Sequence, residues 1–390
     1  MRTIEAIHYK TGELIEIDFQ DGIFTKVDNK GASQDISLPY IAPGLIDLQI
    51  NGYKGIDFNT LPIQESEILR LTRELWSVGV TSFFPTIITN SREKIEEAMV
   101  SIKNVCDKYP EIENSITGIH LEGPFISPED GPRGAHDVQY VRSPDWSLFS
   151  RWQEAAGGKI KIVTLSPEWK GSEYFIRKCT NEGILISIGH TSAEPEQIIA
   201  AIEAGAKLST HLGNGAHEML RRHPNYLWEQ LASEQLAATF ICDGFHLPNS
   251  VIKTIIRMKG NRSIIVSDSV SLAGMEAGEY TNHIGGNVVL TKEGKLHIAE
   301  NPNLLAGSAQ SQLWGINYLL KNNLCKLAEA VDMATVNPAV HLNLTQLKSL
   351  EVNKQADFIL FNYSSEFGIE LISTYKTGNQ VSNKHIGVKK

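Results

Sequence analysis

The chain has 390 residues, of which 42% are hydrophobic and 21% are charged, and its 36 basic and 45 acidic side chains give a net charge of −9. This composition is typical of globular proteins and excludes a disordered chain, a collagen-like repeat and a disulfide-rich miniprotein. The acidic balance also argues against a nucleic-acid-binding protein, because neutralising phosphates requires a basic face. We therefore expect a globular protein that is large enough to enclose a buried site.

The cysteines and the first residues indicate the compartment. The four cysteines are far apart in the chain and form no C-x-x-C pair, so we expect them to be reduced. No apolar signal core follows Met1, and no run approaches the roughly 20 apolar residues of a membrane span. The sequence thus predicts a cytoplasmic protein with no membrane partner.

Both ends of the chain have the alternating pattern of β-strands. Apolar and polar residues alternate over 14–19 and 23–27, and Asp21 and Gly22 between these runs are typical of a hairpin turn. Near the C-terminus, the segment 356–361 predicts another strand. We interpret 1–44 and 346–390 as one small β-sandwich-like domain that both termini form.

Between these ends, short apolar runs that finish in polar residues alternate with segments of helical spacing, which is typical of βα units. Eight strands are expected, at 45–49, 80–86, 116–122, 160–165, 183–190, 206–211, 237–242 and 263–268. This pattern predicts an α/β fold, a (β/α)8 barrel of the TIM type, over 45–345. After the last strand, 284–298 alternates again, and 309–320 and 327–335 have helical spacing.

Four predicted strands end in residues with metal-binding or acid–base side chains: Glu122, His190, His211 and Asp268. The βα loops of a barrel converge on one mouth, so these side chains are expected to lie together. One Glu and two His with an open fourth position form a recognised zinc set, which lowers the pKa of water held there to about 7. Asp268 beside that water can take its proton and pass it to a leaving amine. For each His alone, capping a strand or bonding a loop carbonyl is the competing interpretation.

A single divalent ion per subunit is expected at these residues. Gln49 and Asn51 end the first strand, where a His-x-His would offer nitrogens to a second metal, and an amide is a poor zinc ligand. Zn²⁺ is the expected ion, although Fe²⁺, Co²⁺ and Mn²⁺ accept the same ligands.

Further candidates lie in the loops near the mouth. His136 can donate to a carbonyl oxygen, and His246 follows Asp243 at the end of the seventh strand, where it faces the mouth unless it only caps the strand. Arg222 belongs to a compact basic cluster, and its guanidinium suits a phosphate, with a solvated surface arginine as the competing interpretation. His217 has no partner that the sequence can place, and we assign it no role.

Eight short motifs follow one another along the chain: Ala-Pro-Gly-Leu-Ile-Asp at 42–47, His-Leu-Glu-Gly-Pro-Phe at 120–125, Gly-Ala-His at 134–136, Gly-His-Thr at 189–191, Thr-His-Leu at 210–212, Asp-Gly-Phe-His at 243–246, Val-Ser-Asp at 266–268 and Leu-Ala-Gly-Ser at 305–308. In this order and spacing they are specific. Over nearly its whole length the sequence resembles the N-acetylglucosamine-6-phosphate deacetylases of the amidohydrolase superfamily.

The resemblance implies roles for individual residues. Glu122, His190 and His211 would hold the metal, Asp268 would be the acid and base, and His136 would touch the acyl carbonyl of the substrate. The sugar site would be lined by Ala135, Asn214, Gly215, Asp243 to His246, Leu305, Ala306 and Gly307. In that family an arginine, often from the neighbouring subunit, grips the 6-phosphate. Arg222 is similar in place, so a homodimer follows by analogy.

The sequence departs from this family on the substrate side. Family members usually continue His-Leu with an aromatic residue and then Asn-Ala-Met, whereas this chain has Gly213, Asn214 and Gly215. The glycines remove side-chain bulk beside the sugar. The choice among N-acetylated amino-sugar phosphates, or an unphosphorylated relative, therefore stays open.

The expected function is hydrolysis of the acetamide of N-acetylglucosamine 6-phosphate, which gives glucosamine 6-phosphate and acetate in amino-sugar catabolism. One alternative keeps the barrel and the metal but acts on another N-acetylated amino sugar or on a cyclic amide. A non-enzyme alternative is a sugar-phosphate-binding protein that has lost catalysis, against which the predicted acid–base residue and three ligands speak.

Overall fold

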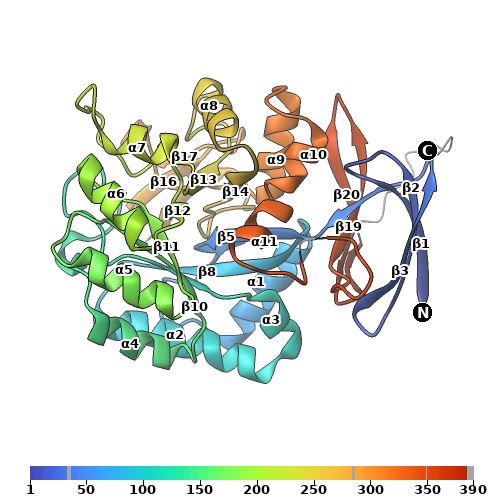
Figure 1. Cartoon of the computed structure of the whole chain (residues 1–390), viewed down its shortest axis with the longest axis horizontal. Coiled ribbons are helices and arrows are strands. Elements are labelled where there is room, and N and C mark those ends of the chain that lie inside the picture. The colour runs from blue at the N-terminus through green and yellow to red at the C-terminus, as the bar shows by residue number, and fades with distance from the viewer. Residues whose placement is uncertain (33–36, 283–285, 348, 384–390) are drawn as a thin grey trace.

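The computed structural model describes residues 1–32, 37–282, 286–347 and 349–383. Figure 1 shows two parts side by side: a barrel wrapped by helices, and a separate sheet that contains the first and last strands of the chain. Among the described residues, every helix is too short or too polar to span a lipid bilayer.

The barrel consists of eight parallel strands in the order β14-β13-β12-β11-β10-β9-β8-β5. Their bounds are β5 (Leu45–Ile50), β8 (Val80–Ile88), β9 (Ile119–Glu122), β10 (Ile160–Leu165), β11 (Leu185–Ile188), β12 (Leu208–Ser209), β13 (Ala237–Ile241) and β14 (Ser263–Val266). A parallel bridge between Ile50 and Ser269 brings the first and last strands together. The predicted barrel is confirmed.

Several strands are shorter than the sequence predicts, above all β11 and β12. Their predicted ranges extend to His190 and His211, and that of β14 extends to Asp268, but these three residues have φ angles of +48°, +29° and +47°. A left-handed backbone cannot continue a strand ladder. The regular pairing therefore stops two residues before each of these side chains.

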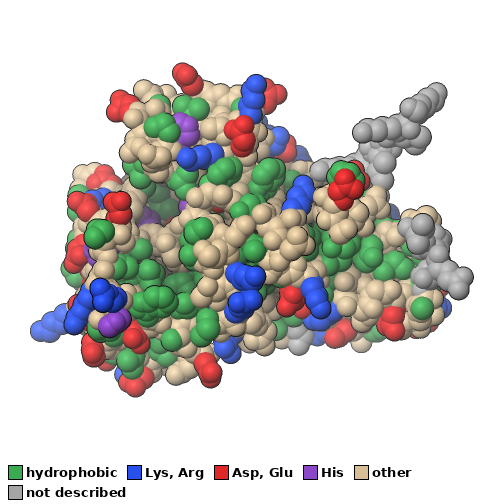
Figure 2. Space-filling view, turned by 90° about the horizontal axis from the view of Figure 1, so that it is seen from above, with side chains coloured by type: hydrophobic (Ala, Val, Ile, Leu, Met, Phe, Trp, Pro, Cys, Tyr) green, Lys and Arg blue, Asp and Glu red, His purple; other side chains and the backbone are tan. Residues whose placement is uncertain are grey.

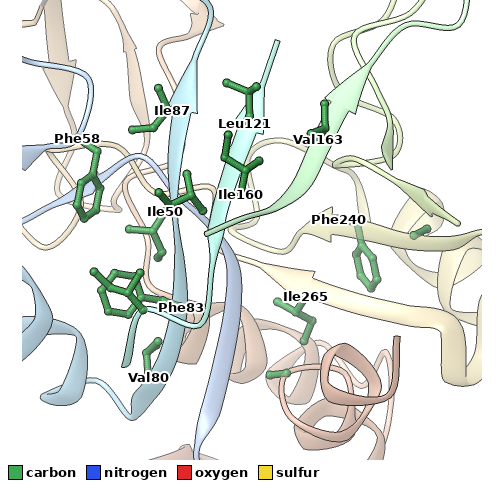
Figure 3. Close-up of a cluster of buried hydrophobic side chains, with 14 of the residues drawn as sticks. Ile50, Phe58, Val80, Phe83, Ile87, Leu121, Ile160, Val163, Phe240 and Ile265 are labelled. Atoms are coloured by element: carbon green, nitrogen blue, oxygen red, sulfur yellow. The ribbon is translucent and has the colours of Figure 1, made fainter. Parts of the chain in front are cut away.

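Helices cover the outside of the barrel because one stripe of each is apolar. In α2, Ser91 caps the first turn by accepting from the backbone N–H of Lys94, and Ile95, Met99 and Ile102 are buried. The helices around the strands are α1 (Glu65–Trp76), α2 (Arg92–Lys108), α3 (Pro110–Ser115), η1 (Val138–Tyr140), α4 (Trp146–Ala155), α5 (Ser172–Asn181), α6 (Pro195–Ala204), α7 (Tyr226–Ala232), α8 (Asn249–Lys259), η2 (Gly260–Arg262), α9 (Gln312–Lys321), α10 (Leu327–Asp332) and α11 (Val336–His341). Figure 3 shows part of the resulting core around β5, β8, β9 and β10.

A four-stranded antiparallel sheet follows β14, in the order β15 (Gly278–Asn282), β16 (Gly286–Leu290), β17 (Leu296–Ile298) and β18 (Asn301–Leu305). The alternation expected over 284–298 corresponds to β16 and β17, and its first two positions lie outside the described residues. The strand β18 was not predicted, because its residues are mostly exposed and, with Pro302 among them, show no apolar alternation. The helices expected at 309–320 and 327–335 are α9 and α10.

Segments near both ends of the chain build one seven-stranded sheet, which confirms the expected β-domain, whereas its sandwich-like character stays a prediction. Its order is β21-β20-β19-β4-β1-β2-β3. The strands are β1 (Arg2–His8), β2 (Leu14–Gln20), β3 (Ile23–Gly31), β4 (Tyr40–Pro43), β19 (Phe358–Ser364), β20 (Gly368–Lys376) and β21 (Asn379–Asn383), and a small hairpin of β6 (Gly52–Tyr53) and β7 (Ile56–Asp57) lies elsewhere in the chain. Asp21 and Gly22 form the β2–β3 turn with positive φ angles, which is the predicted hairpin. The domain limits at 1–44 and 346–390 stay a prediction.

A buried ion pair lies where this sheet meets the barrel. Lys376 Nζ is 2.5 Å from Asp357 Oδ2, and both side chains are almost fully buried. The same ammonium group lies 3.4 Å from Ser82 Oγ on barrel strand β8. Asp357 also accepts from the backbone N–H of Thr377, so the junction depends on residues from distant parts of the chain.

Candidate metal centre and active site

Four predicted residues lie at the C-terminal ends of barrel strands. Glu122 is the last residue of β9, and His190, His211 and Asp268 each lie two residues beyond β11, β12 and β14. The positive φ of the last three costs about 1–3 kcal/mol at each residue and persists only where the surroundings hold it. Backbone strain at three equivalent strand ends therefore marks this mouth as the candidate site.

Three of these side chains meet at one point. Glu122 Oε1 lies 3.2 Å from His190 Nε2 and 3.1 Å from His211 Nε2, and the two Nε2 atoms are 3.0 Å apart. All three residues are buried, and the two imidazole rings are perpendicular. A tetrahedral ion about 2.1 Å from each ligand would place the ligand atoms about 3.4 Å apart. The arrangement fits a divalent metal ion.

The surrounding groups orient these candidate ligands. His190 Nδ1 donates to the carbonyl of Pro132 at 2.8 Å, which leaves the Nε2 lone pair free to bind a metal. Gln49 Nε2 donates to Glu122 Oε1 at 2.9 Å. Burial alone would raise the pKa of Glu122, but the two imidazoles beside it hold that pKa well below its usual range. Glu122 is therefore a carboxylate, the form that binds a metal.

His136 is a fourth potential ligand. Ligating atoms of Glu122, His136 and His190 all lie within 4.8 Å of one another. The separations among Glu122, His190 and His211 are shorter, so we favour that set. His136 Nδ1 is 2.8 Å from Thr89 Oγ1, and burial together with the neighbouring His190 lowers the pKa of His136 to about 3, so its imidazole is neutral.

Asp268 lies beside this cluster. Its Oδ1 accepts a hydrogen bond of 2.8 Å from Asn51 Nδ2. Burial and the charge of Glu122 raise the pKa of Asp268 to about 6. A carboxyl group with such a pKa can accept and release a proton near neutral pH.

A layer of hydrogen-bonded polar side chains, which the sequence analysis missed, lies beneath the cluster. His120 Nδ1 donates to the carbonyl of Leu48 at 3.0 Å, so its Nε2 accepts from Thr164 Oγ1 at 2.7 Å. Thr210 Oγ1 is 2.7 Å from Thr164 Oγ1 and 2.5 Å from Ser187 Oγ. This series of hydrogen bonds runs from β9 through β10 and β11 to Thr210, directly after β12, and so connects the strands that lead to the candidate ligands. Hydroxyl residues inside otherwise apolar strands were the available signal.

A further hydroxyl holds the strained backbone at His211. Thr239 Oγ1 on β13 accepts from the backbone N–H of His211 at 2.7 Å and donates to the carbonyl of Ser209 at 3.2 Å. Thr239 is buried. It therefore fixes both sides of the turn that directs His211 into the mouth.

The other predicted residues lie in loops around the mouth. Gly215 packs against His190, since a Cβ there would lie 2.8 Å from His190 Nδ1. The backbone N–H of Asn214 donates to the carbonyl of His211, whereas Ala135 is exposed. His246 Nδ1 is 2.6 Å from Asp243 Oδ2, so this pair is held within its own loop.

The segment of Leu305, Ala306 and Gly307 reaches the mouth from the four-stranded sheet. Ser308, the next residue, pairs in parallel with Ser269, which directly follows Asp268. Gly307 has a φ of +105°, and a Cβ there would lie 2.6 Å from Val270. Only glycine allows this close approach of the two segments.

Arg222, the residue predicted to bind a phosphate, lies at the surface. It is exposed, and its carbonyl accepts from Trp228 Nε1 at 3.2 Å. With Gly213 it borders a mostly apolar cavity of about 460 Å³ between α7 and α8. Figure 2 shows histidine in a hollow of the surface and basic side chains that project from the left edge of the molecule.

The site geometry and the barrel agree with the comparison to known proteins. Residues 40–384 match the amidohydrolase family. N-acetylglucosamine-6-phosphate deacetylase from Bacillus subtilis (strain 168) is 33% identical over 346 residues, which cover 86% of this chain and 84% of that protein. The chain belongs to the amidohydrolase family. The resemblance that the sequence motifs indicated is thereby confirmed.

Other amidohydrolase relatives bear on the fold and the substrate. The crystal structure of N-acetylglucosamine-6-phosphate deacetylase from Thermotoga maritima is 25% identical and superposes with a TM-score of 0.83 over 98% of this chain and all of that one. N-acetylgalactosamine-6-phosphate deacetylase from Shewanella sp. (strain ANA-3) is 32% identical over 82% of this chain and 78% of that protein. Relatives of nearly equal identity thus act on sugars that differ in one epimeric centre.

Proposed function

We propose that this amidohydrolase removes the acetyl group of N-acetylglucosamine 6-phosphate, giving glucosamine 6-phosphate and acetate in amino-sugar catabolism. The observation that carries the proposal is the convergence of Glu122, His190 and His211 within 3.2 Å beside Asp268. The identity to deacetylases over most of the chain supports the reaction.

The metal would be held by Glu122, His190 and His211, whose spacing fits one divalent ion. When bound, such an ion supplies Lewis-acid activation of water and of a carbonyl oxygen. Gln49 and Asn51 at the end of β5 offer amides, which supports a single ion per subunit, and zinc is the ion we propose.

Asp268 would move the proton in both halves of the reaction. It accepts the proton of the attacking water and then donates it to the amine that leaves, and Asn51 orients the carboxylate through its 2.8 Å hydrogen bond. His136 would stabilise the oxygen of the acetyl carbonyl. Thr89 can donate to His136 Nδ1, which leaves a hydrogen on Nε2 to donate to that oxygen.

The substrate would lie among the surrounding loops. Ala135, Asn214, Gly215, Asp243, His246 and the segment of Leu305, Ala306 and Gly307 would line the sugar site. Arg222 would bind the 6-phosphate across a homodimer, which is consistent with its exposed position. We also propose a cytoplasmic location, which the four free cysteines support.

Acetate release from a panel of substrates tests the proposal. The panel holds N-acetylglucosamine and N-acetylgalactosamine, each with and without the 6-phosphate, and Asp268→Asn is the negative control. We expect the highest kcat/KM with N-acetylglucosamine 6-phosphate. A higher kcat/KM with N-acetylgalactosamine 6-phosphate would show that the galactosamine epimer is the preferred substrate, which is the specificity that the 32% identical relative is named for. No acetate from any of the four would refute a deacetylase.

A further inference from the structure

Two loops meet over the candidate site. The β9 loop (residues 123–137) carries His136, and the β12 loop (residues 212–225) carries Asn214 and Gly215. Glu129 Oε2 in the first loop lies 3.0 Å from His217 Nε2 in the second. No sequence motif indicates that these two loops lie together, and the contact gives His217 a partner.

His217 is fixed from its other side by Tyr226, the first residue of α7. The backbone N–H of His217 donates to Tyr226 Oη at 2.9 Å, and His217 Nδ1 lies 3.0 Å from the same oxygen. One arrangement of hydrogens satisfies every contact: the hydroxyl donates to Nδ1, and Nε2–H donates to the Glu129 carboxylate. Tyr226 is buried in the main hydrophobic core, so this end of the series of hydrogen bonds is anchored.

The loops also touch through their backbones. Gly131 in the β9 loop has a φ of +93°, and a Cβ there would lie 3.0 Å from His217 Cα. Both loops contact one candidate ligand: the carbonyl of Pro132 accepts from His190 Nδ1, and Gly215 lies against the same ring. The Glu129–His217 contact can therefore hold both loops in fixed positions beside His190.

We propose that Glu129, His217 and Tyr226 form a bridge that positions the β9 and β12 loops over the bound substrate. Its loss should loosen the two loops and so weaken substrate binding. The effect on the chemical step should be smaller, because the bridge touches neither Asp268 nor the candidate ligands directly. The binding part of this inference rests on the proposed function. The structural part, the coupling of the two loops, does not.

Amide hydrogen exchange tests the coupling without any substrate. The variants are Glu129→Ala, His217→Ala and the double variant, and the control is Glu218→Ala, which removes an exposed charge next to His217. We expect Glu129→Ala to speed exchange in the β12 loop and His217→Ala to speed it in the β9 loop. Glu129→Gln keeps an acceptor for Nε2–H and should exchange like the wild type. Faster exchange confined to the substituted loop would overturn the bridge.

Steady-state kinetics tests the consequence for binding. Because Glu129 is more than half exposed, we expect a modest effect, about a 2- to 10-fold higher KM with kcat within 2-fold. The double variant should be no worse than either single one, since each breaks the same bridge. Additive effects, or a fall in kcat with KM unchanged, would contradict the proposal. If each substitution speeds exchange in the opposite loop but the protein has no deacetylase activity, the bridge is supported and only the proposed function is refuted.

Discussion

Replacing Thr239 by Val should weaken metal binding, although Thr239 would touch no metal. Val keeps the shape of the side chain and removes the hydroxyl that accepts from the backbone N–H of His211 and donates to Ser209. The N–H is then left buried without its acceptor. Because His211 has a φ of +29°, its backbone can relax once this hydrogen bond is gone, which moves the imidazole from its position beside Glu122 and His190.

The size of the effect follows from the buried hydrogen bond. A buried donor left unpaired costs about 1–3 kcal/mol, which we expect to lose from the free energy of unfolding of the metal-loaded protein. If about 1–2 kcal/mol of this appears as weaker metal binding, the metal dissociation constant rises about 5- to 30-fold. Competition with a chromogenic chelator measures that constant, and denaturant unfolding measures stability.

Thr86 provides a matched control. Its Oγ1 accepts from the backbone N–H of Ile50 at 3.1 Å and donates to the carbonyl of Phe84 at 3.2 Å, and it is fully buried. Thr86→Val should therefore lose similar stability while keeping its metal affinity, and Thr239→Ser should keep both. Wild-type metal affinity in Thr239→Val, or an equal loss of affinity in Thr86→Val, would refute the reasoning.

Four further predictions concern the site itself. His190→Asn or His211→Asn should strip the metal without unfolding the barrel, as elemental analysis and circular dichroism would show, and full metal content in both would exclude them as ligands. Asp268→Asn should retain the metal and substrate affinity but lower kcat about 10²- to 10⁴-fold in an acetate-release assay, since it removes a positioned acid and base. Arg222→Ala should raise KM about 10- to 150-fold for the 6-phosphate sugar and hardly change it for the unphosphorylated sugar. Arg222→Lys should restore KM only in part. Equal effects on both sugars would show that Arg222 has a structural role and does not bind the phosphate. Burial lowers the pKa of His120 to about 4, so as the pH falls this histidine is protonated in the unfolded chain before it is protonated in the folded one. The unfolding free energy of the metal-free protein should therefore fall by up to about 3 kcal/mol between pH 6.5 and 4. Denaturant titrations at both pH values should show a smaller loss for His120→Asn.

The barrel and its polar strand ends could be predicted because both depend on local pattern. Apolar runs identify buried strands wherever they occur in the chain, and barrel geometry then places Glu122, His190 and Asp268 at one mouth. The predicted ranges of β11 and β12 extend too far, because nothing in the sequence indicates that His190 and His211 have positive φ angles. The apolar pattern continues past the point at which the ladder stops.

The contacts between loops could not be predicted from spacing. His217 and Glu129 are brought together only by the folded barrel, and neither lies in a periodic segment. The hydroxyl layer under the cluster was readable in part, since Thr164 and Thr210 interrupt apolar strands, but their mutual distances depend on strand register. Sequence patterns thus identify side chains that can bind a metal or transfer a proton, whereas the groups that orient these side chains are known only from the tertiary structure.

The seven-stranded sheet constrains the order in which the protein can be completed during synthesis. Its strand β4 pairs with β1 on one side and with β19 on the other, where Pro43 lies opposite Phe358. Until the last part of the chain leaves the ribosome, β4 has an open edge of the kind that pairs with other chains. Once β19 and β20 are synthesised, Lys376 pairs with the buried Asp357 where the sheet meets the barrel. A nascent or truncated chain that ends before β19 would keep its barrel sequence intact and still be prone to aggregate through its N-terminal strands.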